Sequence, residues 1–408
     1  MQSLSDKSLK FANSMNSYPN LKLKPGKEKS LLRKHPWVFS GALTNEIRQT
    51  PEGTMVNVTD INNRYLGTGY VQHGSIAVRI ISFIECEIDL IFWTNKIQKS
   101  FKLRQYLQLG DNATTNCYRL MHGEGDDIPG LIIDIYNDTA VIQCHTSGIY
   151  SQIQLICQAL QDVMGSRLKA VYDKSKETLH GTVASASNGL LWGESGDGMV
   201  TENNHRFHVD WVSGQKTGFF LDQRDNRALL GHYAKGKTVL NTFAYTGGFS
   251  VYALMNGASQ VDSVDVSKNA IEVLNRNMAL NLPEASNYNS YAEDTFSFFK
   301  RNEQLYDIVI LDPPAFAKNI GARHNAIMGY KRLNIEGFKK VSQGGLLFTF
   351  SCSQVVDAHT FLQTVMSAAM ESGRNVKVLH RLSQPADHPV NIFHPEGEYL
   401  KGLVLWVE

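Results

Sequence analysis

The second half of the chain alternates strand-like apolar runs with helix-like runs, and this alternation constrains the fold more than any other feature. From residue 200 onward, KTVLNTF, QVDSVDVS, YDIVILDPP and GGLLFTFSCSQ resemble strands, and helical patterns separate them. Strands that alternate with helices form βαβ units, so we expect an α/β domain whose parallel sheet carries helices on both faces. Ligands of such sheets bind outside the carboxyl ends of the strands.

Glycines and acidic residues stand where the predicted strands end. Gly247 follows the first strand, where a glycine lets backbone N–H groups approach a ligand closely. Asp265 ends the second strand, where a carboxylate can accept both hydroxyls of a ribose, and Asp294 follows the third strand, placed to bind an adenine edge. The segment AYTGGFS is not the G-x-G-x-x-G that cradles a dinucleotide pyrophosphate. We therefore expect S-adenosylmethionine as the cofactor, bound by Phe243, Tyr245, Thr246, Gly247, Asp265, Asp294, Asp312 and Pro313.

The fourth predicted strand ends in Asp312, Pro313 and Pro314. Two prolines cannot continue a strand ladder, so they predict a rigid turn. A turn with a solvated acid is the plainer interpretation. An acid that ends an otherwise apolar strand beside a nucleoside site instead favours a functional role for Asp312.

Cys352 lies between two serines at the end of the fifth predicted strand. Most free cysteines are small buried hydrophobic residues, whereas a nucleophilic role requires a depressed thiol pKa, and the residues alone leave both interpretations open. The five cysteines are odd in number and show no CxxC spacing. We therefore expect neither structural disulfides nor a thiolate zinc site.

The N-terminal segment carries a basic run beside aromatic residues. LKLKPGKEKSLLRKHPWVF includes Lys24 and Arg33 before Trp37, although the net charge of the whole chain is only +1. Any nucleic-acid partner must therefore be held by local patches, in which cations neutralise phosphates and aromatic rings stack on bases. A solvated surface run is the alternative. With the β-rich stretch that follows, residues 20–90 resemble a PUA domain, a compact RNA-binding β-fold.

The middle third predicts an α+β segment without a catalytic cluster. Glu124, Asp126 and Asp127 lie in a glycine-rich turn, and we interpret them as solvated loop residues rather than metal ligands. His388 and His394 lie in a loop between the last two strands, with no third ligand in reach by sequence. We therefore expect no metal and assign these histidines to the packing of a substrate loop.

Five motifs carry a resemblance to a known family. NTFAYTGGFS, VDVS, AED, LDPPAFAK and FTFSCS, in this order, resemble those of the bacterial 23S rRNA cytosine-5 methyltransferases that carry an N-terminal PUA domain, and the likeness covers nearly the whole chain. It implies a Rossmann-like class I methyltransferase domain with a seven-stranded sheet. It also implies that Cys352 adds to carbon 6 of a cytosine while Asp312 hydrogen-bonds the ring near N3.

The resemblance also suggests residues on the RNA side. Phe316 is expected to stack on a flipped base, with packing as the alternative, and Lys318 to meet an RNA phosphate. Some RNA cytosine-5 methyltransferases carry a second cysteine after the proline of the fourth-strand motif, where this chain has Pro314, so the base that removes the carbon-5 proton stays unassigned. The segment SGQKTGFFLDQRDNR resembles a further motif of the family. Its residues expected at the pocket are Lys216, Thr217, Gln223 and Arg224, with a structural turn and helix start as the equal alternative.

We therefore expect a PUA-like RNA-binding domain over residues 1–95, an α+β central domain over 96–199 and the methyltransferase domain over 200–408. The expected activity is formation of 5-methylcytidine in 23S rRNA. Methylation of a guanine or an exocyclic amine, with Cys352 dispensable, is one alternative. An RNA-binding ribosome-assembly factor with an inactive methyltransferase fold is another.

The expected partner is large-subunit ribosomal RNA, and a homodimer is considered for the oligomeric state, which the sequence leaves open. MQSLSDKSLKFANSMNSYPN lacks the apolar core of a signal peptide, and no apolar run reaches the ~18 residues of a membrane helix. We therefore expect a cytoplasmic protein that does not act at a membrane.

Overall fold

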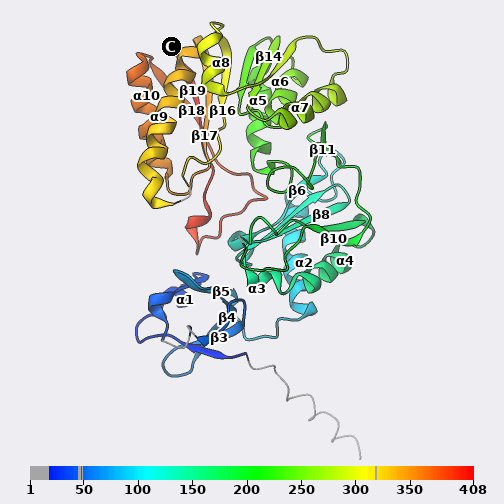
Figure 1. Ribbon diagram of the computed structural model, residues 1–408, viewed down its shortest axis with the longest axis vertical. Helices are drawn as coiled ribbons and strands as arrows, with labels where there is room; N and C mark the ends of the chain where they lie inside the picture. Colours follow the sequence, from blue (N-terminus) through cyan, green and yellow to red (C-terminus); the bar gives the residue numbers. More distant parts are fainter. Residues whose placement is uncertain (1–17, 45–46, 48, 180, 318) are drawn as a thin grey trace, which may run out of the picture.

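A computed structural model of the chain describes residues 18–44, 47, 49–179, 181–317 and 319–408. Three large sheets and one two-stranded sheet follow one another along the molecule (Figure 1). The N-terminal sheet lies at one end, the sheet of the middle third lies next to it, and the large C-terminal sheet lies at the other end.

The N-terminal sheet has five strands in the order β1-β3-β4-β5-β2. Val56 and Val58, two positions apart on β3, are buried in the same apolar cluster as Val78 and Ile80 of β5. This spacing follows from the strand period of two, and the predicted small β unit is confirmed. Its elements are β1 (Asn20–Lys22), α1 (Lys29–Leu32), β2 (Trp37–Phe39), β3 (Met55–Thr59), β4 (Tyr65–Val71) and β5 (Ile76–Ser82).

The central sheet has the strand order β10-β9-β8-β7-β6. Ile97 and Ile156, from helices α2 and α4, share one buried cluster with Ile133 and Ile142 of the sheet. The α+β character is as predicted, and YRLMH forms most of the strand β6 that precedes the acidic turn. The elements are α2 (Leu90–Tyr106), β6 (Cys117–His122), β7 (Leu131–Tyr136), β8 (Thr139–Cys144), α3 (Ser147–Tyr150), α4 (Ile153–Met164), β9 (Ala170–Asp173) and β10 (Gly189–Gly193).

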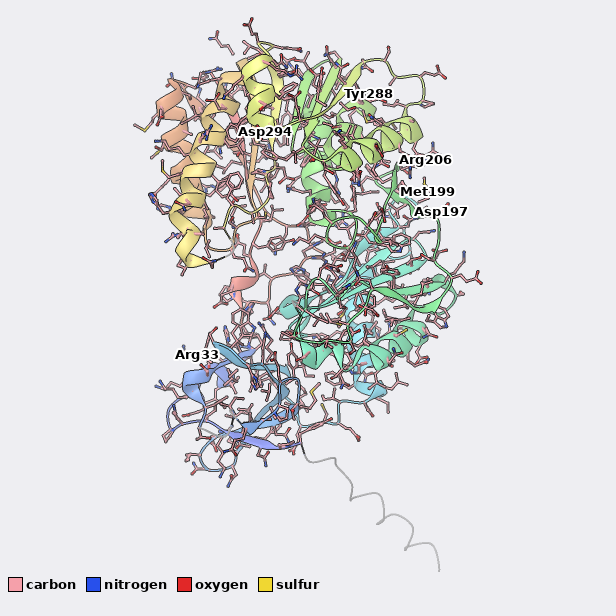
Figure 2. The ribbon with its side chains drawn as sticks, in the orientation of Figure 1. Arg33, Asp197, Met199, Arg206, Tyr288 and Asp294 are labelled. Carbon is pink, nitrogen blue, oxygen red and sulfur yellow. The ribbon has the colours of Figure 1, made fainter. Side chains whose placement is uncertain are left out.

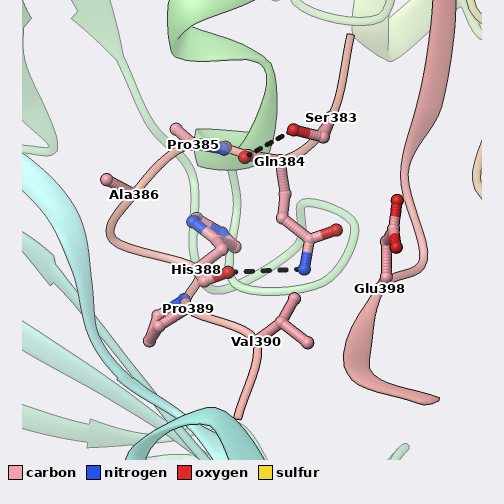
Figure 3. A pocket seen from close by; sticks show the side chains of 8 residues that line it. All are labelled: Ser383, Gln384, Pro385, Ala386, His388, Pro389, Val390 and Glu398. Carbon is pink, nitrogen blue, oxygen red and sulfur yellow. Dashed lines mark hydrogen bonds between the residues drawn. The ribbon is translucent and has the colours of Figure 1, made fainter. Parts of the chain in front are cut away.

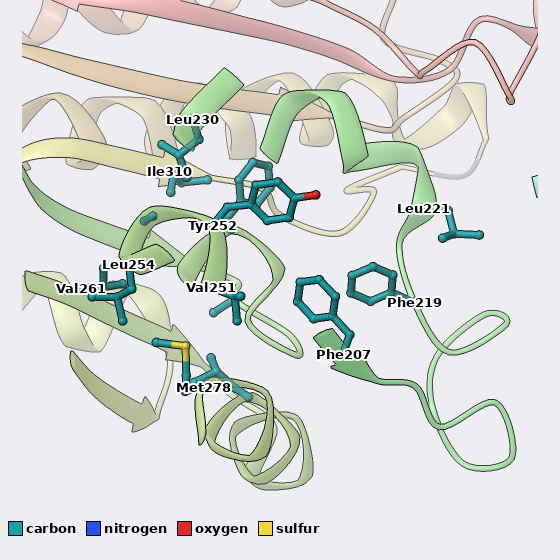
Figure 4. Packing of buried hydrophobic residues seen from close by; sticks show 14 of the residues in the cluster. Phe207, Phe219, Leu221, Leu230, Val251, Tyr252, Leu254, Val261, Met278 and Ile310 are labelled. Carbon is teal, nitrogen blue, oxygen red and sulfur yellow. The ribbon is translucent and has the colours of Figure 1, made fainter. Parts of the chain in front are cut away.

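The C-terminal sheet has seven strands in the order β15-β14-β13-β16-β17-β19-β18 and carries helices on both faces. Residues of α5, α6 and α7 share one buried cluster, in which Tyr252 packs near Phe207 (Figure 4), and residues of α8, α9 and α10 share another. The strands are β13 (Thr238–Thr242), β14 (Gln260–Asp265), β15 (Tyr288–Ala292), β16 (Tyr306–Leu311), β17 (Val341–Ser351), β18 (Val376–Leu382) and β19 (Lys401–Val407). The helices are α5 (Arg224–Ala234), α6 (Gly248–Met255), α7 (Lys268–Asn281), α8 (Thr295–Arg301), α9 (Arg323–Lys340) and α10 (Ala358–Ser372).

One strand departs from the predicted parallel sheet. β19 pairs antiparallel with both β17 and β18, whereas β13 to β17 pair in parallel. Parallel neighbours need a crossover connection, usually a helix, but residues 383–400 contain only one short 3-10 turn, so the chain returns antiparallel. This long loop extends from the large sheet toward the N-terminal sheet (Figure 1).

The two-stranded sheet lies between the central and C-terminal sheets, and it consists of β11 (Met199–Glu202) and β12 (His205–His208). Glu202 forms a buried ion pair with Arg227 of α5, at 2.7 Å between the nearest N and O atoms. The predicted domain boundaries after residues 95 and 199 stay predictions, and α2 continues across the first of them. Within the described residues, no helix is both long enough and apolar enough to cross a membrane.

Candidate active site

The loop between β13 and α6 has a strained backbone. Phe243 and Tyr245 have φ angles of 56° and 47°, in the left-handed region that aromatic residues rarely adopt. Such strain costs about 1–3 kcal/mol and persists only where the surroundings hold it. Tyr245 is held at both ends, because its N–H donates to Asp265 Oδ2 at 2.8 Å and its hydroxyl donates to the Gly218 carbonyl at 3.2 Å. The loop is therefore fixed in one shape beside the carboxyl end of β14.

Gly247 in this loop cannot be replaced without a clash. Its φ is 81°, and a Cβ atom there would lie 2.6 Å from Cγ of Leu274 on α7. The neighbouring Thr246 is buried, and its carbonyl accepts a hydrogen bond from Asn277 Nδ2 at 2.9 Å. The close packing of this loop on α7 thus depends on glycine at position 247.

Asp265 has the capacity that a ribose requires. Its Oδ2 accepts the Tyr245 N–H, and its Oδ1 accepts the Ser267 N–H at 2.9 Å, so each oxygen keeps a lone pair for a hydroxyl. Val266, the next residue, is 76% exposed and offers an apolar surface beside the carboxylate. Asp294 is exposed and caps α8 by accepting the Ser297 N–H at 2.9 Å. This set of groups fits the nucleoside part of S-adenosylmethionine.

Asp312 directly follows β16, and a Gln223 side chain hydrogen-bonds its carboxyl group. Burial raises the pKa of Asp312 to about 7, and the negative charge of Asp222 adds to this effect, while the Gln223 hydrogen bond opposes it. Gln223 Oε1 accepts from Asn226, so its amide N–H₂ faces Asp312. A carboxyl group with a pKa near 7 serves well as a proton donor at neutral pH.

Cys352 directly follows β17, the neighbour of β16, and its Sγ lies 4.0 Å from the Pro313 carbonyl oxygen. Burial raises the pKa of this thiol to about 11, and the charges of Asp312 and Asp222 raise it further, against the opposing effect of Lys216 and Lys401. This differs from the depressed pKa that the sequence interpretation required of a nucleophile. The thiol is therefore protonated at neutral pH and must lose its proton to a base before it reacts.

The serine after this thiol fixes its position. Ser353 is buried, its Oγ lies 2.9 Å from the Tyr330 hydroxyl and accepts the Ala317 N–H at 3.4 Å. Its carbonyl accepts from Lys401 Nζ at 2.7 Å. The segment that carries Cys352 is thus tied to the Asp312-Pro313-Pro314 turn, to α9 and to β19.

Three polar residues at this edge were not predicted from the sequence. The Tyr399 hydroxyl donates to Asp222 Oδ2 at 2.7 Å, and Lys401 Nζ donates to the Tyr399 carbonyl at 2.6 Å. The other Asp222 oxygen, Oδ1, is buried and has no hydrogen-bond partner within the described parts of the chain. The only sequence signal is their place in LDQRD and EYLKG, polar segments next to apolar runs.

The loop of residues 383–400, which leads to Tyr399, is closed on itself. Gln384 Nε2 donates to the His388 carbonyl at 3.3 Å (Figure 3) and to the Gly397 carbonyl at 3.0 Å. His388 packs against Asp387, with 3.1 Å between Nδ1 and a carboxylate oxygen. A pocket of about 230 Å³ lies here, lined by Ser383, Gln384, Pro385, Ala386, His388, Pro389, Val390 and Glu398.

The RNA-side residues predicted near the N-terminus lie away from the strand ends. Lys24 and Arg33 are exposed, and Figure 2 shows Arg33 on the N-terminal part of the molecule and Asp294 on the C-terminal part. Trp37 is half-buried, its indole N–H donates to Glu124 Oε1 at 2.8 Å, and its ring meets the His394 ring edge-on at 4.3 Å between centroids. These internal contacts favour a structural role for Trp37, which joins the N-terminal sheet to the turn that carries Glu124 and to the loop that carries His394.

The other predicted RNA-side residues differ in exposure. Lys216 is exposed, whereas Thr217 is fully buried and donates its hydroxyl proton to Asp134 Oδ2 at 2.6 Å, which favours a structural role. Phe316 packs against the Tyr330 ring at 4.6 Å between centroids, in agreement with the packing alternative. Lys318 lies outside the described residues.

The interpretation of the acidic turn of the central sheet as a solvated loop was wrong for Glu124 and Asp126, whereas the Asp127 side chain is 41% exposed. Asp126 has a side chain only 3% exposed and accepts two hydrogen bonds from the buried Arg104, at 2.5 and 2.8 Å. Glu124 pairs with Arg79 at 2.9 Å. A glycine-rich turn is normally exposed, but here helix α2 supplies a buried arginine that requires a carboxylate partner.

His394 has two further metal-ligand candidates near it, which the sequence did not reveal. Ligand atoms of His35, His394 and Glu396 lie within 4.8 Å of one another. However, His35 Nδ1 accepts the Trp37 N–H at 3.2 Å, so its proton sits on Nε2, which faces Glu396 at 3.6 Å. A metal-binding histidine needs a lone pair toward the metal and its proton on the other nitrogen. This tautomer fits a pair with Glu396 and not a metal ligand.

Comparisons with known proteins identify the family of this chain. The S-adenosylmethionine-dependent methyltransferase family matches residues 119–396, and a PUA-like domain matches residues 21–83. A curated relative from Alteromonas mediterranea is 40% identical over 94% of this chain and 97% of its own length, and one from Escherichia coli is 36% identical over 94% and 98%. Both are called ribosomal RNA large subunit methyltransferase I.

Solved structures give the same picture. A SAM-dependent methyltransferase from Streptococcus mutans has a TM-score of 0.82 at 25% identity, over 95% of this chain and 100% of that chain. A second methyltransferase structure, complexed with SAH, has a TM-score of 0.83 at 26% identity, with the same coverage.

Proposed function

The chain belongs to the S-adenosylmethionine-dependent methyltransferase family, and from this premise we propose that it methylates carbon 5 of a cytidine in large-subunit ribosomal RNA. The observation that carries the proposal is the placement of Cys352 and Asp312 at the ends of neighbouring strands. A thiol and a carboxyl group of raised pKa lie at the same edge of the sheet, and this is the pair that cytosine-5 chemistry needs.

S-adenosylmethionine supplies an electrophilic methyl group when it is bound. Asp265 would accept the ribose hydroxyls with its two remaining lone pairs, and the exposed Val266 would offer an apolar surface to the adenine. Asp294 would use its second carboxylate oxygen for the adenine edge, and the Phe243–Gly247 backbone and Pro313 would hold the rest of the cofactor. These roles follow from where each residue stands at the carboxyl edge of the sheet.

Cys352 and Asp312 share the work on the cytosine ring. Carbon 5 is too weak a nucleophile by itself, so the Cys352 sulfur adds to carbon 6 and makes carbon 5 electron-rich. The protonated Asp312 donates to N3 and neutralises the negative charge that the addition puts on the ring. Lys216 and Lys401 stabilise the thiolate before it attacks, because both lower the pKa of Cys352.

The N-terminal sheet extends the RNA-binding surface in this proposal. Lys24 and Arg33 neutralise phosphates outside the cleft, and Lys216 does so beside it. The protein acts on ribosomal RNA in the cytoplasm. A homodimer stays a prediction.

The test is methylation of ribosomal RNA from cells that lack this protein, with labelled S-adenosylmethionine and nucleoside mass spectrometry. The wild-type protein is expected to form 5-methylcytidine, and Cys352→Ala none. Cys86→Ala is the matched control, because Cys86 is also a half-buried free thiol but belongs to the N-terminal part of the chain, just after β5. A methylated purine, or full activity of Cys352→Ala, would refute the proposal and favour amine methylation at the Asp312 turn.

A further inference from the structure

In the proposed reaction the Cys352 thiol gives its proton to water before the sulfur adds, so the carbon-5 proton is the one that still needs an acceptor in the site. After methyl transfer, carbon 5 carries both a methyl group and a hydrogen atom. To release the product, a base takes the carbon-5 proton, the C–H electron pair forms the C5=C6 double bond, and the C6–S electron pair returns to sulfur as a thiolate. Resting on the proposed function, we propose that Asp222 is the base that accepts this proton and that Tyr399 holds it in place.

Asp222 stands between the two groups that already act on the ring. It lies on the short 3-10 turn Leu221–Gln223, and the side chain of its neighbour Gln223 hydrogen-bonds Asp312. On its other side, Tyr399 binds Asp222 through its hydroxyl and receives Lys401 Nζ at its carbonyl. Lys401 also donates to the carbonyl of the residue after Cys352. Short contacts thus link Asp222 to both catalytic groups.

Asp222 is half-buried, and one of its two carboxylate oxygens is unpaired. Oδ2 accepts from Tyr399 at 2.7 Å, whereas Oδ1 is buried without a hydrogen-bond partner in the described chain. Leaving such an acceptor unpaired costs about 1–3 kcal/mol, so it marks a place where another group is expected. A proton on a substrate carbon is a group that would meet this oxygen.

The other charged groups that act on Cys352 cannot take this proton as well. Lys216 and Lys401 are cations, and Lys401 already donates two hydrogen bonds. Asp312 exchanges its own proton with N3, giving it during addition and taking it back when the double bond returns. Asp222 is the remaining acid in this set, and its negative charge acts on both Asp312 and Cys352.

The test separates methyl transfer from proton removal. A large-subunit ribosomal RNA transcript is made with cytidine tritiated at carbon 5, so each proton removed appears as tritium in water. Wild-type protein is expected to release one tritium per methyl group. Asp222→Asn is expected to slow tritium release by at least about 100-fold, the usual contribution of a general base. It should still transfer methyl in a single turnover, and a methylated protein–RNA adduct that survives denaturing gels should accumulate.

Three further variants complete the experiment. Asp222→Glu keeps a carboxylate and is expected to release tritium faster than Asp222→Asn. Tyr399→Phe keeps the Asp222 carboxylate but removes the hydroxyl that holds it, so it should slow tritium release less than Asp222→Asn does. Asp225→Asn is the matched control, because Asp225 follows shortly after Asp222, in the first turn of α5, with a side chain 63% exposed. Wild-type tritium release by Asp222→Asn, or a folded Asp222→Asn that forms no methylated adduct, would overturn the assignment. A wild-type protein that makes no 5-methylcytidine would instead refute the proposed function itself.

Discussion

Arg224 and Asp387 form a buried bidentate ion pair that fastens the loop of residues 383–400 to helix α5. Their N–O distances are 2.8 and 3.0 Å, and both side chains are almost fully buried. The same carboxylate accepts the Arg119 N–H at 3.0 Å, and Arg104 donates to the Asp387 carbonyl at 2.7 Å. One acid therefore joins the C-terminal domain to the central sheet and fixes the start of the loop that leads to Tyr399.

Removing this acid should destabilise the protein strongly. Asp387→Ala leaves the buried Arg224 with only the mostly exposed Asp225, at 3.5 Å, as an acidic partner, and we expect a loss of about 3–5 kcal/mol in the free energy of unfolding, measured by urea denaturation. Glu336→Ala removes only an exposed pair with Lys339 and should change stability by less than about 1 kcal/mol. Equal effects of the two variants would contradict the structural role of the buried pair.

The stability contributed by Asp387 should also depend on pH. Burial by itself raises the pKa of this carboxyl, but His388 and Arg224 outweigh burial and hold the pKa far below the ordinary range. A depressed pKa contributes stability that is complete above the unfolded-state pKa of about 4 and is lost as the pH falls below it. The stability difference between wild type and Asp387→Ala should thus shrink below about pH 4, which acid titration followed by circular dichroism checks.

Gly247→Ala should impair cofactor binding through a clash rather than through φ alone. The new Cβ would lie 2.6 Å from Leu274 Cγ, so the loop must move away from α7. We expect at least a 10-fold weaker affinity for S-adenosylmethionine by calorimetry. The control is Gly257→Ala, since Gly257 has a similar φ of 85° but its nearest new neighbour is Lys235 Cγ at 3.7 Å. Similar losses of affinity in both variants would mean that backbone strain, and not the clash with Leu274, weakens cofactor binding.

The sequence sufficed to predict the place of residues whose position depends only on where one strand ends. Gly247, Asp265, Asp312 and Cys352 each follow an apolar run, and parallel strands bring such ends to one edge of the sheet. The hydrogen bond between Tyr399 and Asp222 joins residues 177 positions apart, and no local pattern indicates it.

Burial was equally hard to predict from local sequence. Thr217 belongs to a polar segment, yet it is fully buried because its hydroxyl pairs with the buried Asp134 of the central sheet. Asp126 lies in a glycine-rich turn, yet Arg104 from a different element covers it. In both cases the decisive partner is distant in sequence, so tertiary contacts override the local signal for exposure.

Cys352 should react slowly with alkylating agents when no RNA is bound. With a thiol pKa raised to about 11 by burial and by Asp312, only about 0.1% of it is thiolate at pH 8, compared with roughly a quarter for an ordinary cysteine. We expect iodoacetamide to modify Cys352 at least ~10-fold more slowly than Cys86, measured by peptide mass spectrometry. Lys401→Met should slow it further, because Lys401 lowers this pKa. Rapid alkylation of Cys352 in the wild type would instead indicate a thiol already activated in the free protein.

Asp312 should lower the stability of the folded protein at high pH while it supports methyl transfer, and measurements at two pH values distinguish these effects. Because burial raises the pKa of Asp312 to about 7, its protonated form is favoured by folding, and the stability that it contributes at low pH is lost as the pH rises from about 4 to about 7. Asp312→Asn removes this loss, so it should be more stable than wild type at pH 8, by at most about 4 kcal/mol, and the gain should be smaller at pH 5. Methyl transfer should fall by at least about 100-fold, since the amide cannot supply the proton that N3 receives. In the wild type, the protonated fraction of Asp312 falls above about pH 7 while the thiolate fraction of Cys352 rises until about pH 11, so kcat/KM should level off above about pH 7. Thermal unfolding at pH 5 and pH 8 tests the stability part. If the stability gain of Asp312→Asn over wild type is no larger at pH 8 than at pH 5, the raised pKa is contradicted.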